Sequence, residues 1–550
     1  MHRTTNGGQT WQEISPDLTL NDKSRQQRSG GLTPDNVGVE YSGVVFAIAE
    51  SPREKGVIWA GTNDGQVQVT RDNGARWTNV TANLPGLPPW GTVSNIEPSR
   101  YDAGTAYVTL DLHQVNNRDP FVYKTTDFGR TWKSVSGDLP RTVSSYAHCV
   151  REDPVKRGLL YLGTESGVYF SMDDGQHWLP LQSGLPHAPA HWLTIQEQFS
   201  DLVVATYGRG FWILDDVTPL RALGPEALNQ SATLFPLRPA YRLRYITEPM
   251  MMPDDPTEGR NPPYGADINF YMKTALPPVD PADTQAAGRV KLVISDASGK
   301  TVRTIEVGKD VTAGINRVWW DLRTDPTPEI KLRTPPLHVA DFPMGADGLR
   351  KFPTSGRLSV LVPPGTYTIK LVGAGEDRTQ SLTVRKDPLT EGSEQDIASQ
   401  TKVMMLIYDD MSNVAKTINA AETVRAQIAQ LEKLMGDAES VRSVKKAADE
   451  LDAKIADIES RLFNMTATGR GQDQLRTPSQ MVEKLTHLAD VVAYADFRPT
   501  DSQLEVQTKL SQEIARDRER LSGTLARDVA SFNLLLRDRQ LGAIVIPPVE

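Results

Sequence analysis

The 550-residue chain contains a single cysteine, Cys149, and no long hydrophobic run. Without a second cysteine, neither an internal disulfide nor a zinc site built from cysteines can form, and we expect Cys149 to be a small buried residue of a strand. No stretch approaches the roughly 18 consecutive apolar residues of a membrane-spanning helix. The formal net charge of −9 leaves no basic excess for a nucleic-acid-binding face.

The usual sequence motifs of cofactor and metal enzymes are also missing. The chain has no glycine-rich phosphate loop, no His-Glu-x-x-His zinc helix and no Gly-x-Ser-x-Gly nucleophile elbow. We therefore expect no cofactor, no metal, no nucleic-acid partner and no transmembrane segment. The length predicts roughly three domains.

What the sequence does have is an eight-residue pattern that occurs four times, at 4–11, 70–77, 125–132 and 171–178. The pattern begins with Ser or Thr and has Asp or Asn at its third position, Gly at its fifth and Trp at its eighth; the other positions vary. A short acid or amide closes a turn by accepting backbone N–H groups, the glycine supplies a positive φ, and the tryptophan starts the returning strand. We expect these residues to be structural rather than catalytic: Asn6, Gly8, Trp11, Asp72, Gly74, Trp77, Asp127, Gly129, Trp132, Asp173, Gly175 and Trp178.

The repeats set the frame of a β-propeller over residues 1–221. The tryptophan spacings are 77 − 11 = 66, 132 − 77 = 55 and 178 − 132 = 46 residues, and the last is typical of a four-stranded blade. Apolar strands precede three of the patterns, and a last unit at 202–214 keeps the strands without the pattern. Because the first repeat begins at its turn, we expect earlier blades and an export signal on a missing N-terminal part.

The four turns resemble the Asp-box, or BNR repeat, of sialidases and sortilin-type receptors. Together with the stretch Tyr-Gly-Arg-Gly-Phe-Trp-Ile-Leu-Asp-Asp at 207–216 and the modules that follow, they resemble the C-terminal half of large bacterial proteins labelled sortilin-like or BNR-repeat glycosyl hydrolases. The resemblance implies an exported protein, secreted or periplasmic, in the broad class of xyloglucanases and sortilin receptors. No catalytic residue of that class can be matched to a position here.

Residues 222–388 are expected to form a linker, irregular at 250–256, and a β-sandwich. Its strands are predicted at 266–273, 290–295, 302–307, 316–322, 358–362, 366–372 and 380–384. It resembles the Ig-like modules of exported bacterial proteins, and the proline-rich stretch 325–356 is expected to be a long loop on it.

From residue 389 the apolar period changes to about 3.5, which predicts a helical hairpin on both sides of Gly436, two further helices at 478–495 and 502–539, and a docked apolar tail at 543–548. The predicted fold is thus mainly β, with an incomplete Asp-box propeller, an Ig-like sandwich and a C-terminal helical bundle at 389–550.

The ligand face of a propeller usually collects the turns between second and third strands and the entries to the inner strands. Acids and aromatic side chains at such positions suit a polar, sugar-like or peptide ligand. The residues expected there are Glu40, Tyr41, Asn63, Asp64, Trp90, Asp111, His113, Tyr146, His148, Glu165, His191, Trp192, Tyr207 and Arg209.

Three functions remain open. The first is an exported propeller that binds glycans or peptides. The second is a glycoside hydrolase, which needs two carboxylates, with Asp64, Asp111 and Glu165 as candidates; we favour the alternative that these acids satisfy turn amides. A sialidase-like site would need several arginines, and only Arg209 lies on the face. The third is an assembly module that contacts a protein partner through the helical tail.

Overall fold

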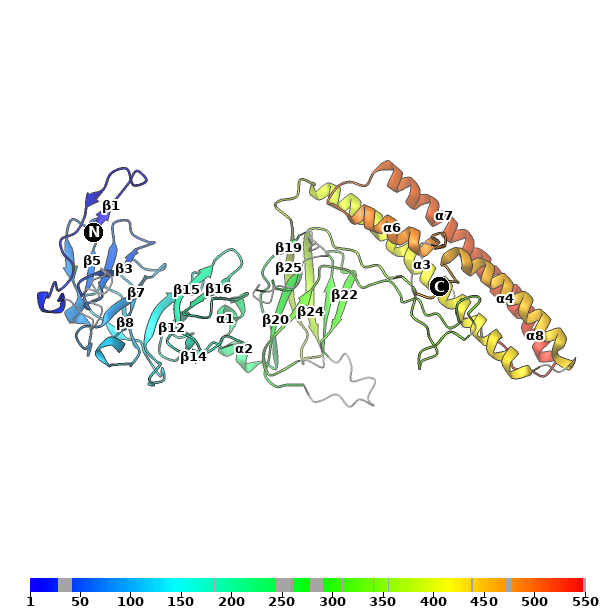
Figure 1. The fold of residues 1–550 in the computed structure, drawn as a ribbon, viewed down its shortest axis with the longest axis horizontal. Helices are drawn as coiled ribbons and strands as arrows, with labels where there is room; N and C mark the ends of the chain where they lie inside the picture. The colour runs from blue at the N-terminus through cyan, green and yellow to red at the C-terminus, as the bar shows by residue number, and fades with distance from the viewer. Residues whose placement is uncertain are drawn as a thin grey trace. The chain divides into compact units, whose positions relative to one another are not determined.

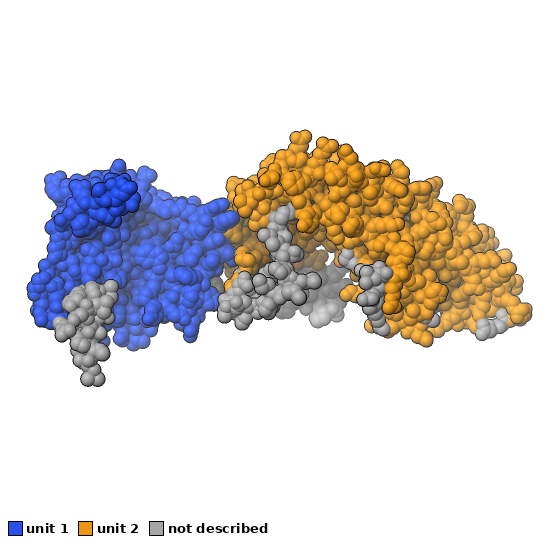
Figure 2. Space-filling view, turned by 45° about the horizontal axis from the view of Figure 1, so that its top comes forward, with its two compact units in different colours: residues 1–229 blue, residues 230–550 orange. Residues whose placement is uncertain are grey.

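The computed structural model describes residues 1–27, 42–182, 184–243, 259, 261–276, 290–307, 311–339, 341–354, 356–436, 439–469 and 476–547. The chain divides into two compact units, 1–229 and 230–550 (Figure 2). The fold is mainly β, with small antiparallel sheets, and ends in a helical region. None of the helices within these ranges is long and apolar enough to cross a membrane.

The first unit is a series of small antiparallel sheets whose strands follow one another in chain order (Figure 1). This up-and-down order is that of propeller blades. A two-stranded sheet of β1 (His2–Arg3) and β2 (Gln12–Glu13) is followed by sheets of four, four, four and three strands. Their bounds are β3 (Val45–Glu50), β4 (Ile58–Thr62), β5 (Val67–Thr70) and β6 (Trp77–Asn79); β7 (Thr92–Pro98), β8 (Ala106–Asp111), β9 (Phe121–Thr125) and β10 (Lys133–Ser134); β11 (Ala147–Glu152), β12 (Leu160–Thr164), β13 (Gly167–Ser171) and β14 (Leu179–Pro180); β15 (Ala190–Gln196), β16 (Asp201–Thr206) and β17 (Phe211–Leu214).

Short helical turns complete this unit. Among the described residues of this unit are three 3₁₀ turns, and two short α-helices follow the last sheet. Their bounds are η1 (Lys23–Arg25), η3 (Thr81–Asn83), η4 (His113–Val115), α1 (Thr218–Ala222) and α2 (Pro225–Asn229).

The four repeat turns share one hydrogen-bond network. In the third, the Thr125 hydroxyl donates to Asp127 and accepts the N–H of Gly129 at 2.9 Å, while Asp127 also accepts the N–H of Thr131 at 2.9 Å. The other three turns contain the same bonds, with Asn6 in place of the acid in the first. These acids and hydroxyls therefore satisfy backbone groups of their own turns.

The turn glycine is also where one sheet approaches the preceding one. A Cβ at Gly175 (φ +82°) would lie 2.7 Å from the Cβ of Val135. The neighbouring Trp178 is buried and donates its indole N–H to the Val135 carbonyl at 2.9 Å. Gly129 and Gly74 meet Val80 and Ile14 in the same way, so the second, third and fourth turns each pack against the end of the sheet before them. Trp11 of the first turn, in contrast, is 61% exposed.

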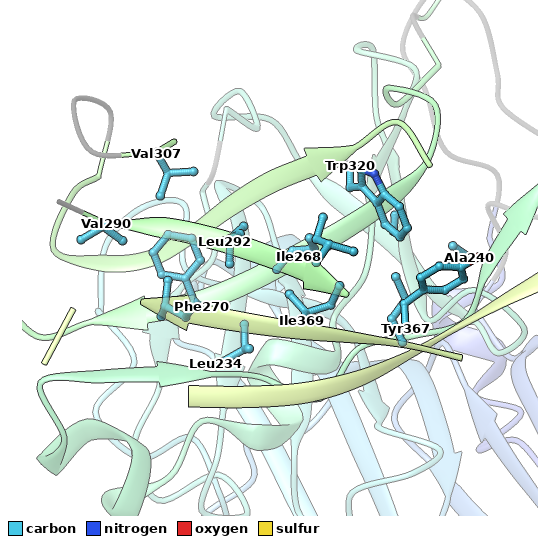
Figure 3. Packing of buried hydrophobic residues seen from close by; sticks show 14 of the residues in the cluster. Leu234, Ala240, Ile268, Phe270, Val290, Leu292, Val307, Trp320, Tyr367 and Ile369 are labelled. Atoms are coloured by element: carbon cyan, nitrogen blue, oxygen red, sulfur yellow. The ribbon is translucent and has the colours of Figure 1, made fainter. Parts of the chain in front are cut away.

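The second unit begins with two sheets that share one hydrophobic core (Figure 3). The first has the order β18 (Ala232–Leu234), β20 (Ala266–Met272), β23 (Gly314–Trp320), and the second has the order β19 (Ala240–Arg242), β25 (Arg378–Lys386), β24 (Gly365–Val372), β21 (Lys291–Ser295), β22 (Thr301–Glu306). Strands β18 and β19 lie where the sequence predicted none. The strand expected at 358–362 is reduced to an isolated bridge between Leu361 and Arg323. The linker expected at 250–256 lies outside the described residues.

Helices form the rest of the second unit. They are α3 (Glu394–Met435), η5 (Glu439–Val441), α4 (Arg442–Leu462), α6 (Met481–Ala493), α7 (Asp501–Thr524), a π-helical turn η6 (Leu525–Val529) and α8 (Ala530–Asp538). A capping box at Ser393 starts the 42-residue α3. The C-terminal tail docks on the helices, because Ile544 is buried and exchanges two hydrogen bonds with Asn533.

The proline-rich stretch expected to lie on the sandwich packs on the helices instead. Ile330 and Leu332 belong to the helical core. The buried Glu422 of α3 accepts the N–H and hydroxyl of Thr334, both at 2.7 Å. Burial of Ile330 and Leu332 and the hydrogen bonds to Glu422 therefore hold this segment on the helices. The spacing of residues in the sequence does not reveal such distant partners.

Candidate functional site

The candidate site lies at one edge of the sheets in the first unit. Because neighbouring strands are antiparallel, the start of each first strand and the turn between the second and third strands meet at the same edge. Pairing of Ala147 with Thr164 and of Ala190 with Thr206 shows this for two sheets. The repeat turns, which join third and fourth strands, lie at the opposite edge.

Five aromatic rings form a continuous row along this edge, which we call the ring row: His113, Tyr146, His148, His191 and Tyr207. Successive ring centroids are 4.9, 5.3, 4.1 and 5.4 Å apart. The first and last pairs are stacked, with interplanar angles of 24° and 19°. The residues come from three successive sheets, so the row crosses two boundaries between sheets.

Two carboxylates flank the ring row. Asp111, at the end of β8, lies 2.8 Å from Nδ1 of His113 and accepts its backbone N–H at 2.9 Å. Glu165, in the turn between β12 and β13, lies 2.9 Å from Nε2 of His148. Burial, followed by a hydrogen bond to Glu165, raises the pKa of Tyr146 to about 12. His191 is exposed at its surface, but its ring is partly desolvated by its neighbours; this desolvation and the adjacent His148 lower its pKa, which favours the neutral imidazole.

Two histidines of the ring row, His148 and His191, lie at irregular positions of their strands. The register of each first strand shifts by one residue near its start, at Phe46, Ser94, His148 and His191. A bulge of this kind turns one side chain away from the regular alternation. His148 and His191 therefore occupy equivalent positions in consecutive sheets.

A glycine allows these two positions to approach. Gly163 of β12 faces the next sheet, where a Cβ would lie 2.3 Å from the carbonyl oxygen of Ala190; it would also lie 3.0 Å from Sγ of Cys149 on the paired strand β11. The chain of β15 can therefore pass directly over β12. This contact sets how closely the two strands approach. His148 follows Ala147 on β11 and His191 follows Ala190 on β15, and the centroids of the two imidazole rings are 4.1 Å apart.

One group in the ring row has the composition of a metal site. A ligand atom from each of His148, Glu165 and His191 lies within 4.8 Å of the other two. Two imidazoles and a carboxylate are donors that suit zinc and related divalent ions. We expected no metal, because the chain has neither a second cysteine for a zinc site nor a His-Glu-x-x-His helix.

The other residues expected on this face have different surroundings. Asp64 is 1% exposed and accepts the backbone N–H of Leu20 at 2.9 Å and the Thr62 hydroxyl. Asn63 accepts the N–H groups of Gly43 and Val44, both at 2.9 Å. These two side chains therefore serve local backbone groups. Glu40 and Tyr41 lie outside the described residues.

The ring-to-ring contacts of the ring row do not include three other residues expected on this face, Trp90, Arg209 and Trp192. The guanidinium of Arg25 lies 4.7 Å from the ring centroid of Trp90. Arg209 is exposed, and its carbonyl accepts the indole N–H of Trp212 at 3.0 Å. The ring of Trp192 is covered by Arg151, whose guanidinium carbon lies 4.2 Å from its centroid.

A cavity of about 530 Å³ lies among the first strands of the sheets, and sequence reasoning did not predict it. Trp192, Arg151 and Glu97 line it, with the exposed side chains of Phe46 and Ile48. Burial raises the pKa of Glu97 to about 7, although Arg151 lies 3.1 Å away and opposes the shift. Charged residues inside the apolar first strands were the sequence signal that could have revealed this cavity.

The equivalence of His148 and His191 also had a sequence signal. Second strands end in threonine at Thr62, Thr164 and Thr206. Superposing the repeats on these residues, instead of on the turn tryptophans, brings the two histidines within one residue of each other, since 164 − 148 = 16 and 206 − 191 = 15, and the pairing register then aligns them.

Comparison with known proteins gives a weak sequence relationship, and no family model matches the chain. A probable oligoxyloglucan-reducing end-specific xyloglucanase of Neosartorya fischeri is 25% identical over 177 residues, which cover 29% of this chain and 21% of the relative. The chain therefore matches about a fifth of that protein's length.

Solved structures with similarity include a xyloglucanase and YCF48. A xyloglucanase from Xanthomonas campestris is 14% identical, with coverage of 62% of this chain and 54% of its own and a TM-score of 0.25. YCF48 from Cyanidioschyzon merolae is 13% identical, with coverage of 63% and 85% and a TM-score of 0.21. The description of the sheets as blades rests on the strand pairing given above.

Proposed function

We propose that the protein binds a glycan along the ring row, as part of an exported Asp-box propeller with an Ig-like module and a helical region after it. The observation that carries this proposal is the continuous row of five rings with Asp111 and Glu165 beside it. Aromatic faces pack on the apolar faces of sugar rings, and carboxylates accept sugar hydroxyl groups. The accessible end of the row is Tyr207, which is 74% exposed.

The first ligand to test is oligoxyloglucan, because the curated relative is described as acting on it. Isothermal titration with oligoxyloglucan, with an unrelated soluble polysaccharide and with a peptide pool separates glycan from peptide binding. We expect Tyr207→Ala to weaken glycan binding about tenfold, since a stacked ring contributes about 1.5 kcal/mol.

Trp11→Ala is the matched control, because Trp11 is an exposed aromatic residue on the opposite edge and its loss should leave binding unchanged. Peptide binding that depends on Tyr207, without glycan binding, would replace the proposal by a peptide receptor. Binding that Tyr207→Ala leaves intact would remove the ring row as the site.

A second function, glycoside hydrolysis, is favoured by the presence of two accessible carboxylates in one row. Asp111 and Glu165 keep 12% and 28% of their side-chain surfaces exposed, whereas Asp64 is buried. Release of reducing ends from oligoxyloglucan that is abolished by Glu165→Gln and by Asp111→Asn would support the hydrolase. Binding without turnover would leave the binding function alone.

A further inference from the structure

The strongest unassigned feature of the chain is the group of two imidazoles and one carboxylate at the centre of the ring row. His148 comes from β11, Glu165 from the turn after β12 and His191 from β15. One ligand atom of each lies within 4.8 Å of the other two. Nε2 of His148 and Oε2 of Glu165 are 2.9 Å apart.

These positions are close to those that a bound metal ion requires. Two ligands at about 2.05 Å from zinc, at a tetrahedral angle, are about 3.3 Å from each other. His148 and Glu165 would separate by about 0.4 Å as the ion replaces the proton between them. The third ligand atom, on the exposed ring of His191, lies within 4.8 Å of the other two and would approach by rotation of that ring.

The surroundings hold the ligands in place. His148 and His191 sit on equivalent bulges, and the close approach at Gly163 fixes the distance between their strands. The ring of Tyr146 packs edge-on against the ring of His148, with centroids 5.3 Å apart, and supports that ligand from outside the group. Because His191 is exposed, one side of the ion would stay open to water or to a ligand.

We propose that His148, Glu165 and His191 bind one divalent transition-metal ion, with zinc as the best match. Imidazole nitrogen selects zinc, cobalt or nickel over calcium and magnesium, which prefer sets made of oxygen ligands. The site has three protein ligands and an open position. This proposal does not depend on glycan binding, which can be measured with chelator present.

The test is metal titration of the tag-free full chain after chelator treatment and dialysis. Calorimetry with Zn²⁺ and visible absorption with Co²⁺ should both give one equivalent per chain, and Ca²⁺ and Mg²⁺ should not compete. His148→Ala and His191→Ala should each weaken binding at least a hundredfold, and Glu165→Gln at least tenfold. Zinc should also raise the melting temperature of the unmodified chain.

His113→Ala is the matched control, because His113 belongs to the ring row but not to the three ligands. His2→Ala controls for binding at the N-terminus. Circular dichroism of each variant shows whether the fold is kept, and Glu165→Gln, which preserves size, gives a second readout if a histidine variant does not fold. Absence of stoichiometric binding, or binding that the three ligand variants leave unchanged, would overturn the proposal.

Discussion

Nε2 of His148 lies 2.9 Å from Oε2 of Glu165, although His148 belongs to β11, Glu165 to the turn after β12, and 17 positions separate them. The contact follows from the pairing of Ala147 with Thr164, which places His148 at the bulge after the first paired residue of β11 and Glu165 just beyond the last paired residue of β12. A bulge then turns His148 toward the turn that carries Glu165. The chemistry of this edge therefore depends on strand register, and register can be tested.

Gly163→Ala should disturb the ring row without touching any of its rings. The new Cβ would lie 2.3 Å from the Ala190 carbonyl oxygen, so β15 has to move away from β12. We expect a loss of about 2 to 4 kcal/mol in the free energy of unfolding. Urea unfolding measures the loss. Gly224→Ala, which has open space at its Cβ, is the control and should change stability by less than about 1 kcal/mol.

Gly175→Ala should lower the free energy of unfolding by more than the strain of a positive φ alone explains. Gly175 and Gly184 have φ values of +82° and +85°, but only Gly175 lies against another sheet, where its Cβ would meet Val135. Gly184→Ala should therefore cost about 1 to 2 kcal/mol from backbone strain, and Gly175→Ala about 2 kcal/mol more from the clash. Equal losses in thermal or urea unfolding would mean that the sheets do not approach closely at this turn.

Glu97 should make stability fall as the pH rises. Its pKa is about 7 in the folded protein and about 4.5 in the unfolded chain, so the folded state holds more protons between these values. The stability contributed by the protonated carboxyl is complete below about pH 4.5 and is lost as the pH rises through 7. The shift of 7 − 4.5 = 2.5 pH units corresponds to about 3 kcal/mol.

Glu97→Gln should remove this dependence, because the amide has the shape of the protonated acid and can still accept a hydrogen bond from Arg151. Unfolding midpoints in urea from about pH 5 to about pH 8 measure the slope. The charged groups that act on Glu97 are Arg151, Glu152 and Arg100. A slope that persists in Glu97→Gln would assign it to a different group.

Arg425→Met should strongly destabilise the second unit. Arg425 is buried and lies 2.9 Å from both Asp452 and Glu459. Removal of a buried ion-pair partner costs about 3 to 5 kcal/mol. Arg442→Met, which breaks the exposed pair with Glu439, should cost less than about 1 kcal/mol.

Glu459→Gln should be tolerated at neutral pH. Burial, followed by repulsion from Glu422, raises the pKa of Glu459 well above its usual value, which favours the protonated carboxyl beside Arg425, and an amide has the same shape as that form. Urea unfolding should show a change of about 1 kcal/mol or less. A loss as large as that of Arg425→Met would mean that Glu459 is ionised in the folded protein.

The sequence predicted much of the local structure because the interactions that form it are local. Each repeat turn is closed by hydrogen bonds between residues no more than four positions apart, such as Thr125 with Gly129. Apolar periodicity located α3 for the same reason, since a helix repeats its contacts along its own length. Where a segment takes its shape from distant partners, as Ile330 and Thr334 do from the helices, sequence spacing gave the wrong neighbour.

The sequence by itself determined the repeat, its turns and the edge at which His148, Glu165 and His191 lie. Only the tertiary structure decided that these three side chains meet. Their proximity requires two bulges, one strand register and the close packing of two sheets at Gly163. Each of these depends on contacts between strands far apart in the chain, and a one-residue change in register would turn the side chains to opposite faces.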